Sequence, residues 1–82
     1  MPNLSQELQD EVESVVADTV SFAKNFPRLK YALLSKALQM QRMADLLEVV
    51  PKTGNDSLDI PISQHREMCK EVARRLIAIY NA

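Results

Sequence analysis

Glycine is almost absent from this sequence, with a single residue, Gly54, in a chain of 82. The four prolines add few further turn signals, whereas a β-sandwich or β-barrel needs a turn about every 8–12 residues. A glycine-rich loop of the kind that binds phosphates is excluded as well, because such a loop needs several glycines. The scarcity of turn residues therefore predicts a helical chain.

Cysteine is equally scarce, and the one cysteine, Cys69, excludes an intramolecular disulfide and any zinc module built from several cysteines. His65 lies four residues before it on one helical face, a spacing that suits a Cys–His nucleophile or half of a metal site. The chain has no second cysteine or histidine to complete either site. Because cysteine is among the most buried residue types, we interpret the pair as core packing. We expect no enzyme, no cofactor, no metal and no small-molecule substrate.

Long apolar runs are also missing from the chain. No stretch approaches the roughly 18 apolar residues that a membrane-spanning helix requires. The segment from Met1 to Glu7 lacks the basic residues and the apolar core of a signal peptide. We therefore expect no membrane association and a cytoplasmic location.

Neither sign of charge dominates, since ten Lys and Arg stand against eleven Asp and Glu for a net charge of −1. This balance gives no general attraction to nucleic acid or to acidic membranes. The charges are nevertheless segregated: residues 7–18 hold five acids and no base, and residues 19–44 hold five bases and no acid. We interpret this pattern as two helices with complementary charges across their contact. The alternative is a pair of recognition faces, one of them basic.

What the sequence does contain is apolar residues at helical spacing. They make up 46 % of the chain, which suits one folded domain over residues 1–82, and they recur at helical intervals in three segments. The pattern predicts an all-α fold, a small antiparallel three-helix bundle with helices over about 4–25, 27–50 and 63–80. The expected core stripes are Leu8, Val12, Val15, Thr19, Phe22 and Phe26; then Leu29, Leu33, Ala37, Met40, Ala44 and Leu47; and finally His65, Cys69, Val72, Leu76 and Ile79.

Prolines and capping residues predict where these helices begin and end. Asn3 is a suitable N-cap for the first helix and Ser63 for the third. Pro27 is expected to end the first helix and to begin the second, in a turn that folds one back on the other. The alternative is one long helix kinked at Pro27, whose apolar stripes a second chain would cover in an intertwined helical oligomer. Residues 51–62 are expected to form a loop in which residues 58–62 extend across the end of the bundle.

The segment 27–50 carries a second apolar face nearly opposite the first, at about 100° per residue. A helix that is apolar on two sides is central in its fold or is covered on one side by a partner. With three helices available, the chain cannot easily surround this one. We therefore predict a protein–protein interaction module, a small regulator, adaptor or inhibitor, that binds itself as a homo-oligomer, most simply a dimer, or binds a larger protein. The predicted interface residues are Tyr31, Leu34, Leu38, Arg42, Asp45 and Val49.

The basic residues support an alternative hypothesis, a small dimeric nucleic-acid-binding regulator. Lysine and arginine gather at the predicted turn between the first two helices and along one row of the third, where they would contact phosphates. The predicted contact residues are Lys24, Arg28, Lys30, Arg66, Lys70 and Arg74. Two glutamates interleave with the row on the third helix, and we expect local ion pairs between Glu67 and Lys70 and between Glu71 and Arg75. These pairs weigh against the alternative.

Overall fold

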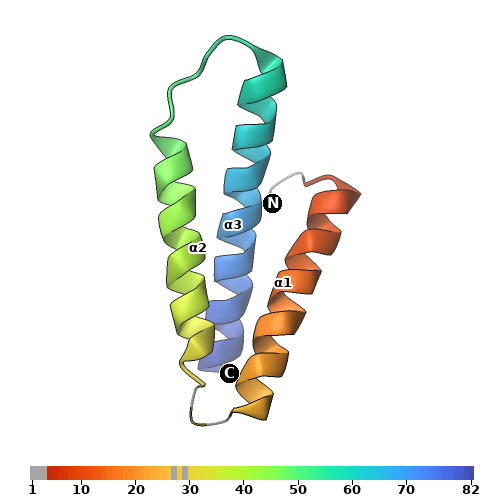
Figure 1. The fold of residues 1–82 in the computed structure, drawn as a ribbon, viewed down its shortest axis with the longest axis vertical. Helices are drawn as coiled ribbons and strands as arrows, with labels where there is room; N and C mark the ends of the chain where they lie inside the picture. Colours follow the sequence, from red (N-terminus) through yellow and green to blue (C-terminus); the bar gives the residue numbers. More distant parts are fainter. Residues whose placement is uncertain (1–3, 27, 29) are drawn as a thin grey trace.

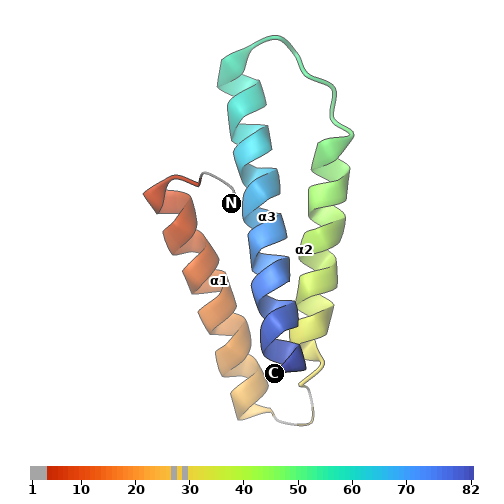
Figure 2. The same ribbon diagram turned by 180° about the vertical axis from the view of Figure 1, so that it is seen from behind.

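The computed structural model describes residues 4–26, 28 and 30–82 of the chain. These residues form three helices, α1 (Gln6–Asn25), α2 (Ala32–Glu48) and α3 (Asp56–Asn81), each antiparallel to the one before it (Figure 1). α2 and α3 lie side by side along their length, with α1 inclined to them (Figure 2). The molecule is elongated, 46 Å long and 24 by 18 Å across. The prediction of a small all-α bundle of three antiparallel helices is confirmed.

α1 begins after Ser5, whose hydroxyl oxygen accepts a hydrogen bond from the backbone N–H of Leu8 (3.3 Å). This is the usual contact of a serine N-cap, so α1 starts at Gln6 rather than near residue 4. The predicted cap, Asn3, lies outside the described residues. At the other end Phe26 has left the helical conformation, with φ −131° and ψ 74°. This change agrees with the expectation that the residue before a proline is pushed out of the α region.

The chain reverses direction between α1 and α2, so the two segments are separate helices rather than one kinked helix. Pro27, to which the prediction assigned this turn, lies outside the described residues, as does Leu29 of the expected core stripe. α2 begins at Ala32, later than predicted, and its N-cap residue Tyr31 makes no side-chain hydrogen bond to the helix.

α3 begins at Asp56, well before the predicted start at Ser63. Its N-cap is Asn55, whose side-chain oxygen accepts a hydrogen bond from the N–H of Ser57 (3.0 Å). The expectation that residues 58–62 are extended is therefore wrong, because all five are helical and Pro61 lies inside the helix. Three alternating apolar residues are too few to distinguish a strand from a helix, and the capping at Asn55 favours the helix.

The turn that precedes α3 is held by one carboxylate. Asp59 accepts hydrogen bonds from the backbone N–H groups of Thr53 (2.9 Å) and Gly54 (3.0 Å) and from the Thr53 hydroxyl (3.0 Å). These bonds lower the pKa of Asp59, with the bond from the Thr53 N–H as the largest cause. Gly54 has a positive φ of 82°, a conformation that favours glycine. The single glycine of the chain thus stands where the backbone requires it.

The core lies along the contact between α2 and α3, and α1 covers one side of it. The predicted stripes of α2 and α3 are confirmed in their central parts, whereas His65 and Ile79 at the ends of the α3 stripe are exposed. The buried hydrophobic residues are Val12, Val16, Leu33, Ala37, Met40, Ala44, Met68, Cys69, Val72, Ala73 and Leu76.

The core face of α1 differs from the predicted one. Val12 and Val16 are buried and Val20 is partly buried, whereas Phe22 and Phe26 are exposed to about half of their surface. The predicted stripe assumed the repeat of 3.5 residues per turn found in supercoiled helices, and a straight α-helix drifts from that repeat by about 20° per heptad. The drift turns Phe22 away from the core, whereas Phe26 lies just beyond the last helical residue, Asn25. Their rings pack on each other, with centroids 5.0 Å apart.

Candidate interaction surface

The side of α2 that faces away from the core is apolar and exposed. Tyr31, Leu38 and Val49 are 60 %, 56 % and 77 % exposed. Leu34 is half-buried, and Arg42 and Asp45 are exposed. At about 100° per residue, all of them fall on the same side of the helix. The structure thus brings together the six residues that the sequence predicts as an interface. We call this set the α2 outer face: Tyr31, Leu34, Leu38, Arg42, Asp45 and Val49.

The interface predicted from the sequence did not include Leu46, which is 69 % exposed, or Met43, which is exposed as well. Both side chains flank the α2 outer face. A projection of the sequence onto a helix at about 100° per residue places Leu46 next to Arg42 at the edge of this face. Leu46 and Met43 help to line an open hollow of about 780 Å³ along α2. The residues that line this hollow are Tyr31, Leu34, Ser35, Leu38, Gln39, Arg42, Met43 and Leu46.

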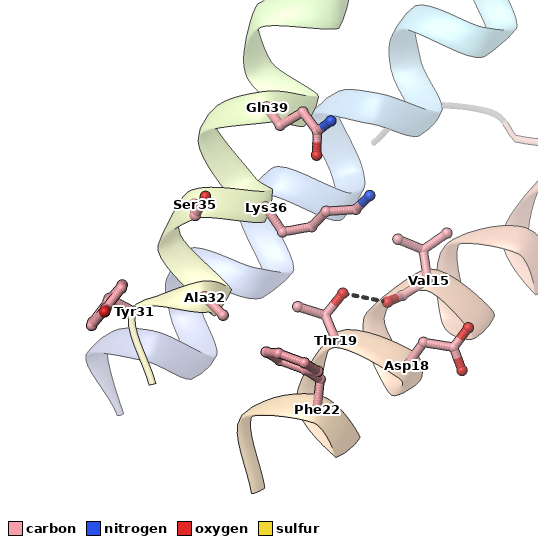
Figure 3. A pocket seen from close by; sticks show the side chains of 9 residues that line it. All are labelled: Val15, Asp18, Thr19, Phe22, Tyr31, Ala32, Ser35, Lys36 and Gln39. Carbon is pink, nitrogen blue, oxygen red and sulfur yellow. Dashed lines mark hydrogen bonds between the residues drawn. The ribbon is translucent and has the colours of Figure 1, made fainter. Parts of the chain in front are cut away.

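A second hollow, of about 600 Å³, lies between α1 and α2 (Figure 3). It exists because α1 packs more extensively on α3 than on α2. Val15, Thr19 and Phe22 line it from α1, and Ala32 and Lys36 line it from α2. Both hollows share the side chains of Tyr31, Ser35 and Gln39. The two hollows therefore form one continuous surface that runs from α1 across α2.

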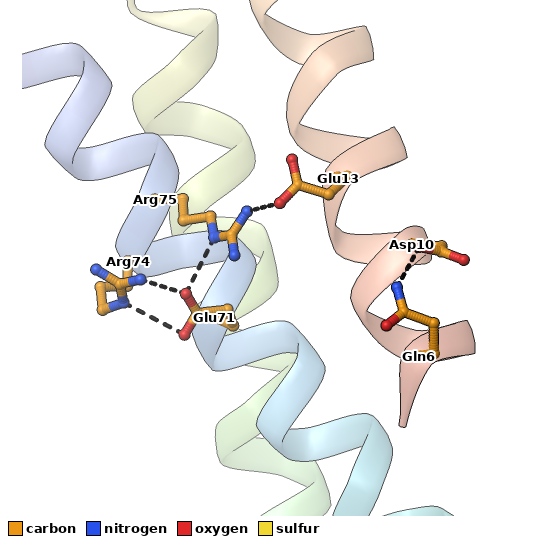
Figure 4. Close-up of polar contacts among 6 residues, drawn as sticks. All are labelled: Gln6, Asp10, Glu13, Glu71, Arg74 and Arg75. Carbon is orange, nitrogen blue, oxygen red and sulfur yellow. Dashed lines mark hydrogen bonds and ion pairs between the residues drawn. The ribbon is translucent and has the colours of Figure 1, made fainter. Parts of the chain in front are cut away.

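The expected charge complementarity between α1 and α2 is not observed. Within residues 4–26, 28 and 30–82, no ion pair joins these two helices. Asp18 and Lys36 line the same hollow, but Figure 3 shows Lys36 extending toward α1 while the Asp18 carboxylate is directed away from it. The acidic helix is instead tied to α3, where Arg75 donates a hydrogen bond to Glu13 (Figure 4). The charge segregation in the sequence therefore does not correspond to ion pairs between α1 and α2 in the described part of the chain, although the two helices are in contact.

Glu71 is the centre of a charged cluster on α3 (Figure 4). Although only 8 % of the residue is exposed, its carboxylate accepts hydrogen bonds from Arg74 Nε (3.3 Å) and Nη2 and from Arg75 Nε (3.1 Å). These bonds, that from Arg74 first, hold the pKa of Glu71 below its ordinary value. Because Arg75 also pairs with Glu13, the cluster joins α3 to α1. The cluster therefore stabilises the packing of α1 against α3.

The basic row on α3 is compensated by carboxylates. Arg66 and Lys70 lie 3.6 and 3.9 Å from Glu67, and Arg74 pairs with Glu71. The two ion pairs predicted from the sequence, Glu67 with Lys70 and Glu71 with Arg75, are both present. The row therefore presents little net positive charge to a phosphate backbone.

The other three basic residues, Lys24, Arg28 and Lys30, are exposed around the connection between α1 and α2. The Lys30 ammonium lies 5.4 Å from the centre of the Tyr80 ring near the end of α3, within the usual range of a cation–π contact. Arg66 lies fourteen residues before Tyr80 on α3, which is about 21 Å along the helix. The row on α3 thus extends away from Lys30: Arg74 lies about 9 Å from Tyr80 along the helix, whereas Arg66 lies at the far end of the row.

Cys69 and His65, four residues apart on α3, differ in their exposure to solvent. Cys69 is fully buried in the core, which confirms the interpretation of the thiol as a packing group, and burial raises the pKa of that thiol. Because the thiolate is the form that attacks substrates and binds metals, this environment disfavours both roles. His65 is exposed, so its expected place in the core is wrong. Among the described residues, no group of three or more His, Cys, Asp and Glu side chains is arranged to hold a metal ion.

Comparison with known proteins adds no assignment. No protein-family model matches the chain, no curated protein is significantly similar to it, and no solved structure matches its fold significantly. Within the described part of the chain, none of the helices has the length and apolar character needed to cross a membrane. The surfaces of the molecule are therefore the basis on which its function can be inferred.

Proposed function

We propose that this chain is a protein–protein interaction module, a small regulator, adaptor or inhibitor without catalytic activity of its own. It acts through the α2 outer face, and its first partner is a second copy of itself. A single exposed apolar side chain is ordinary on a protein surface, whereas several exposed apolar side chains gathered on one side of a helix are typical of a binding surface. The observation that carries the proposal is that Tyr31, Leu38 and Val49 are all more than half exposed on one side of α2.

The arrangement of the helices explains why this face stays open. The opposite side of α2 is committed to the core through Leu33, Ala37, Met40 and Ala44, and α1 packs chiefly on α3. Fully burying a leucine or valine side chain is worth about 1.5–3 kcal/mol. Because the apolar side chains of the α2 outer face are already partly buried, a partner that covers the face gains a part of this free energy from each of them, and the sum works against the cost of association.

The nucleic-acid hypothesis has weaker support. Glu67 and Glu71 compensate the basic row on α3, and three exposed cations at one end of the bundle would neutralise few phosphates. A cytoplasmic location stays a prediction from the sequence.

Static light scattering on the purified protein tests the proposal. We expect a mass above the 9.3 kDa of one chain, rising with concentration, and a shift to the monomer in Leu38→Glu, because a charge would be buried in the contact. Leu34→Glu should have the same effect. Leu58→Glu is the matched control, since Leu58 is 52 % exposed but belongs to α3, and it should leave the mass unchanged.

A second measurement separates a lost contact from a lost fold. Leu38 is exposed in the single chain, so Leu38→Glu should keep its helical circular dichroism and its thermal midpoint at concentrations where the wild type is a monomer. A wild-type protein that stays a monodisperse monomer, with Leu34→Glu and Leu38→Glu variants of equal solubility and stability, would refute self-association through this face.

A further inference from the structure

We infer that α2 of a second copy of this chain covers the α2 outer face in the antiparallel direction, with Arg42 of each copy opposite Asp45 of the other. The inference rests on the proposed function and adds to it the direction and the register of the contact.

The exposed side of α2 has the spacing of a helix–helix contact. Its residues follow one another at intervals of four, three, four, three and four, the recurrence by which two helices keep one stripe in contact along their length. Between the first and the last residue the stripe is about 27 Å long. We call it the α2 seam: Tyr31, Ser35, Leu38, Arg42, Asp45 and Val49.

Five of these residues belong to the α2 outer face, and the sixth, Ser35, is exposed as well. Leu34 and Leu46 flank the seam on its two sides, where they widen the apolar contact. A second helix that lies along this seam would therefore meet apolar side chains at both ends and a pair of charges near the middle.

The two charges are arranged so that the surface complements itself. Arg42 and Asp45 lie one turn apart. In a parallel pair of α2 helices each would face its own counterpart, and like charges would meet. An antiparallel pair centred between residues 43 and 44 places each Arg42 opposite Asp45 of the other copy. A single two-fold contact then contains two ion pairs, because residue i meets residue j and j meets i.

The same register pairs two of the three apolar residues of the seam, whereas Tyr31 lies beyond the overlap of the two α2 helices. Leu38 of one copy lies opposite Val49 of the other, on both sides of the charged centre. A slip of seven residues would place Arg42 opposite Leu38 instead and would break both ion pairs. Polar residues inside an otherwise apolar seam commonly specify register in this way.

Among the residues that the structure describes, neither charge is engaged in an ion pair. Asp45 accepts one hydrogen bond, from Gln41 Nε2 (3.2 Å), which leaves further acceptor positions on its carboxylate. Arg42 forms no ion pair with any residue in the described part of the chain. The arginines of α3, in contrast, all lie within ion-pair distance of a glutamate. Arg42 and Asp45 are thus the complementary pair available on this face.

The size of the seam predicts a reversible dimer. In this register the seams of the two copies overlap over residues 38–49, about 17 Å of helix. Stable interfaces bury about 1,200–2,000 Å² in total, and the area buried along so short a contact lies below that range. We expect a dissociation constant in the micromolar range, so that the equilibrium is measurable by sedimentation.

Charge reversal tests the register. Sedimentation equilibrium would compare the wild type, Arg42→Asp, Asp45→Arg and an equimolar mixture of these two variants. Each variant alone should associate at least tenfold more weakly, because the introduced residue meets a like charge. The mixture should recover association as a heterodimer, since one variant has carboxylates at both positions and the other has guanidinium groups at both. Lys24→Asp, a charge reversal on α1, is the control and should dimerise normally.

Cysteine pairs test the direction. An antiparallel contact predicts a disulfide between Leu38→Cys and Val49→Cys chains when the two are mixed under oxidation. The two copies of position 38 would lie about 16 Å apart along the helix axis, beyond the Cα separation of about 4.4–6.8 Å that a disulfide spans. Leu38→Cys alone should therefore form none. The natural Cys69 is buried and does not compete.

The outcomes separate this inference from the proposed function. A wild-type chain that is a monomer at about 1 mM would overturn both. A dimer that persists in Arg42→Asp and in Asp45→Arg, with no preference for the heterodimer in the mixture, would overturn the register and leave self-association in place. A disulfide in Leu38→Cys alone would overturn the antiparallel direction.

Discussion

The substitution Glu71→Gln should weaken the bundle in a pH-dependent way. Glu71 receives hydrogen bonds from Arg74 and Arg75, and Arg75 connects this cluster to Glu13 of α1. Glutamine keeps the volume of the side chain but removes its charge and one strong acceptor oxygen. The variant therefore measures the contribution of the ionised carboxylate rather than that of packing.

The size of the effect follows from the exposure of the groups involved. A hydrogen bond to a charged group contributes about 1.5–3 kcal/mol. The side chains of Arg74 and Arg75 are 64 % and 35 % exposed. In the Glu71→Gln variant, water molecules can therefore hydrogen-bond the guanidinium groups in place of the carboxylate. We therefore expect a loss of only about 1 kcal/mol at neutral pH, which lowers the Tm by about 4–8 °C for a domain of this size.

The pH dependence has a definite sign. The pKa of Glu71 is lowered in the folded chain, first by its hydrogen bond with Arg74. The unfolded chain therefore binds a proton at a higher pH than the folded chain does. The stabilisation is complete above the ordinary pKa of 4.5 and is lost as the pH falls through the lowered folded value. The difference between wild type and Glu71→Gln should thus shrink below that pH.

Thermal unfolding followed by circular dichroism, from pH 7 down to about pH 2, would check this prediction. Glu67→Gln is a matched control, because its contacts with Arg66 and Lys70 at 3.6 and 3.9 Å are longer than hydrogen bonds, and its Tm should fall by less than about 3 °C. A Glu71→Gln difference that is absent at pH 7, or that is equally large at pH 2, would refute the reasoning.

Three further predictions concern the core and the alternative function. Leu76→Ala should destabilise the fold by about 2–5 kcal/mol in denaturant titrations, because Leu76 is fully buried; a smaller loss would contradict its central position. The Cys69 thiol should react slowly with a thiol reagent until the chain unfolds, since it is buried and its pKa is raised; rapid labelling of the folded protein would disprove this. Duplex DNA should not be retained at about 50 mM salt, whereas retention that Lys30→Ala abolishes would favour the nucleic-acid hypothesis.

The sequence predicted the fold best where local signals and tertiary packing agree. The stripe of α2 from Leu33 to Ala44 has helical spacing and is buried as expected. The predicted start of α3 was wrong because the residues from Leu58 to Ile62 alternate in polarity, which suggested an extended segment. The hydrogen bond from the Ser57 N–H to the Asn55 side chain, which starts the helix earlier, is seen only in the folded turn. The position of Phe22 depends on a rotation that accumulates along α1, which a spacing rule of 3.5 residues does not include.

Which residues lie together on one helix face could be predicted from the sequence, whereas the contacts between helices could not. The six residues of the α2 outer face follow from the periodicity of one helix, which the sequence contains in full. Contacts between helices depend on which faces meet, so the link between Glu13 and Arg75 could not be derived from spacing. The segregated charges suggested ion pairs between α1 and α2, whereas the acidic helix pairs with Arg75 of α3.

The weaker packing of α1 on α2 than on α3 also determines which helix unfolds first. α2 and α3 share the larger part of the core, while α1 contacts α3 along one side and leaves a hollow toward α2. Segments with fewer tertiary contacts detach at a lower free energy than the molecule as a whole. Amide hydrogens of α1 should accordingly exchange with solvent well before those at the centre of the α2–α3 hairpin. Native fluctuations would then release α1 as a unit, and the paired helices would remain as the last structure to melt.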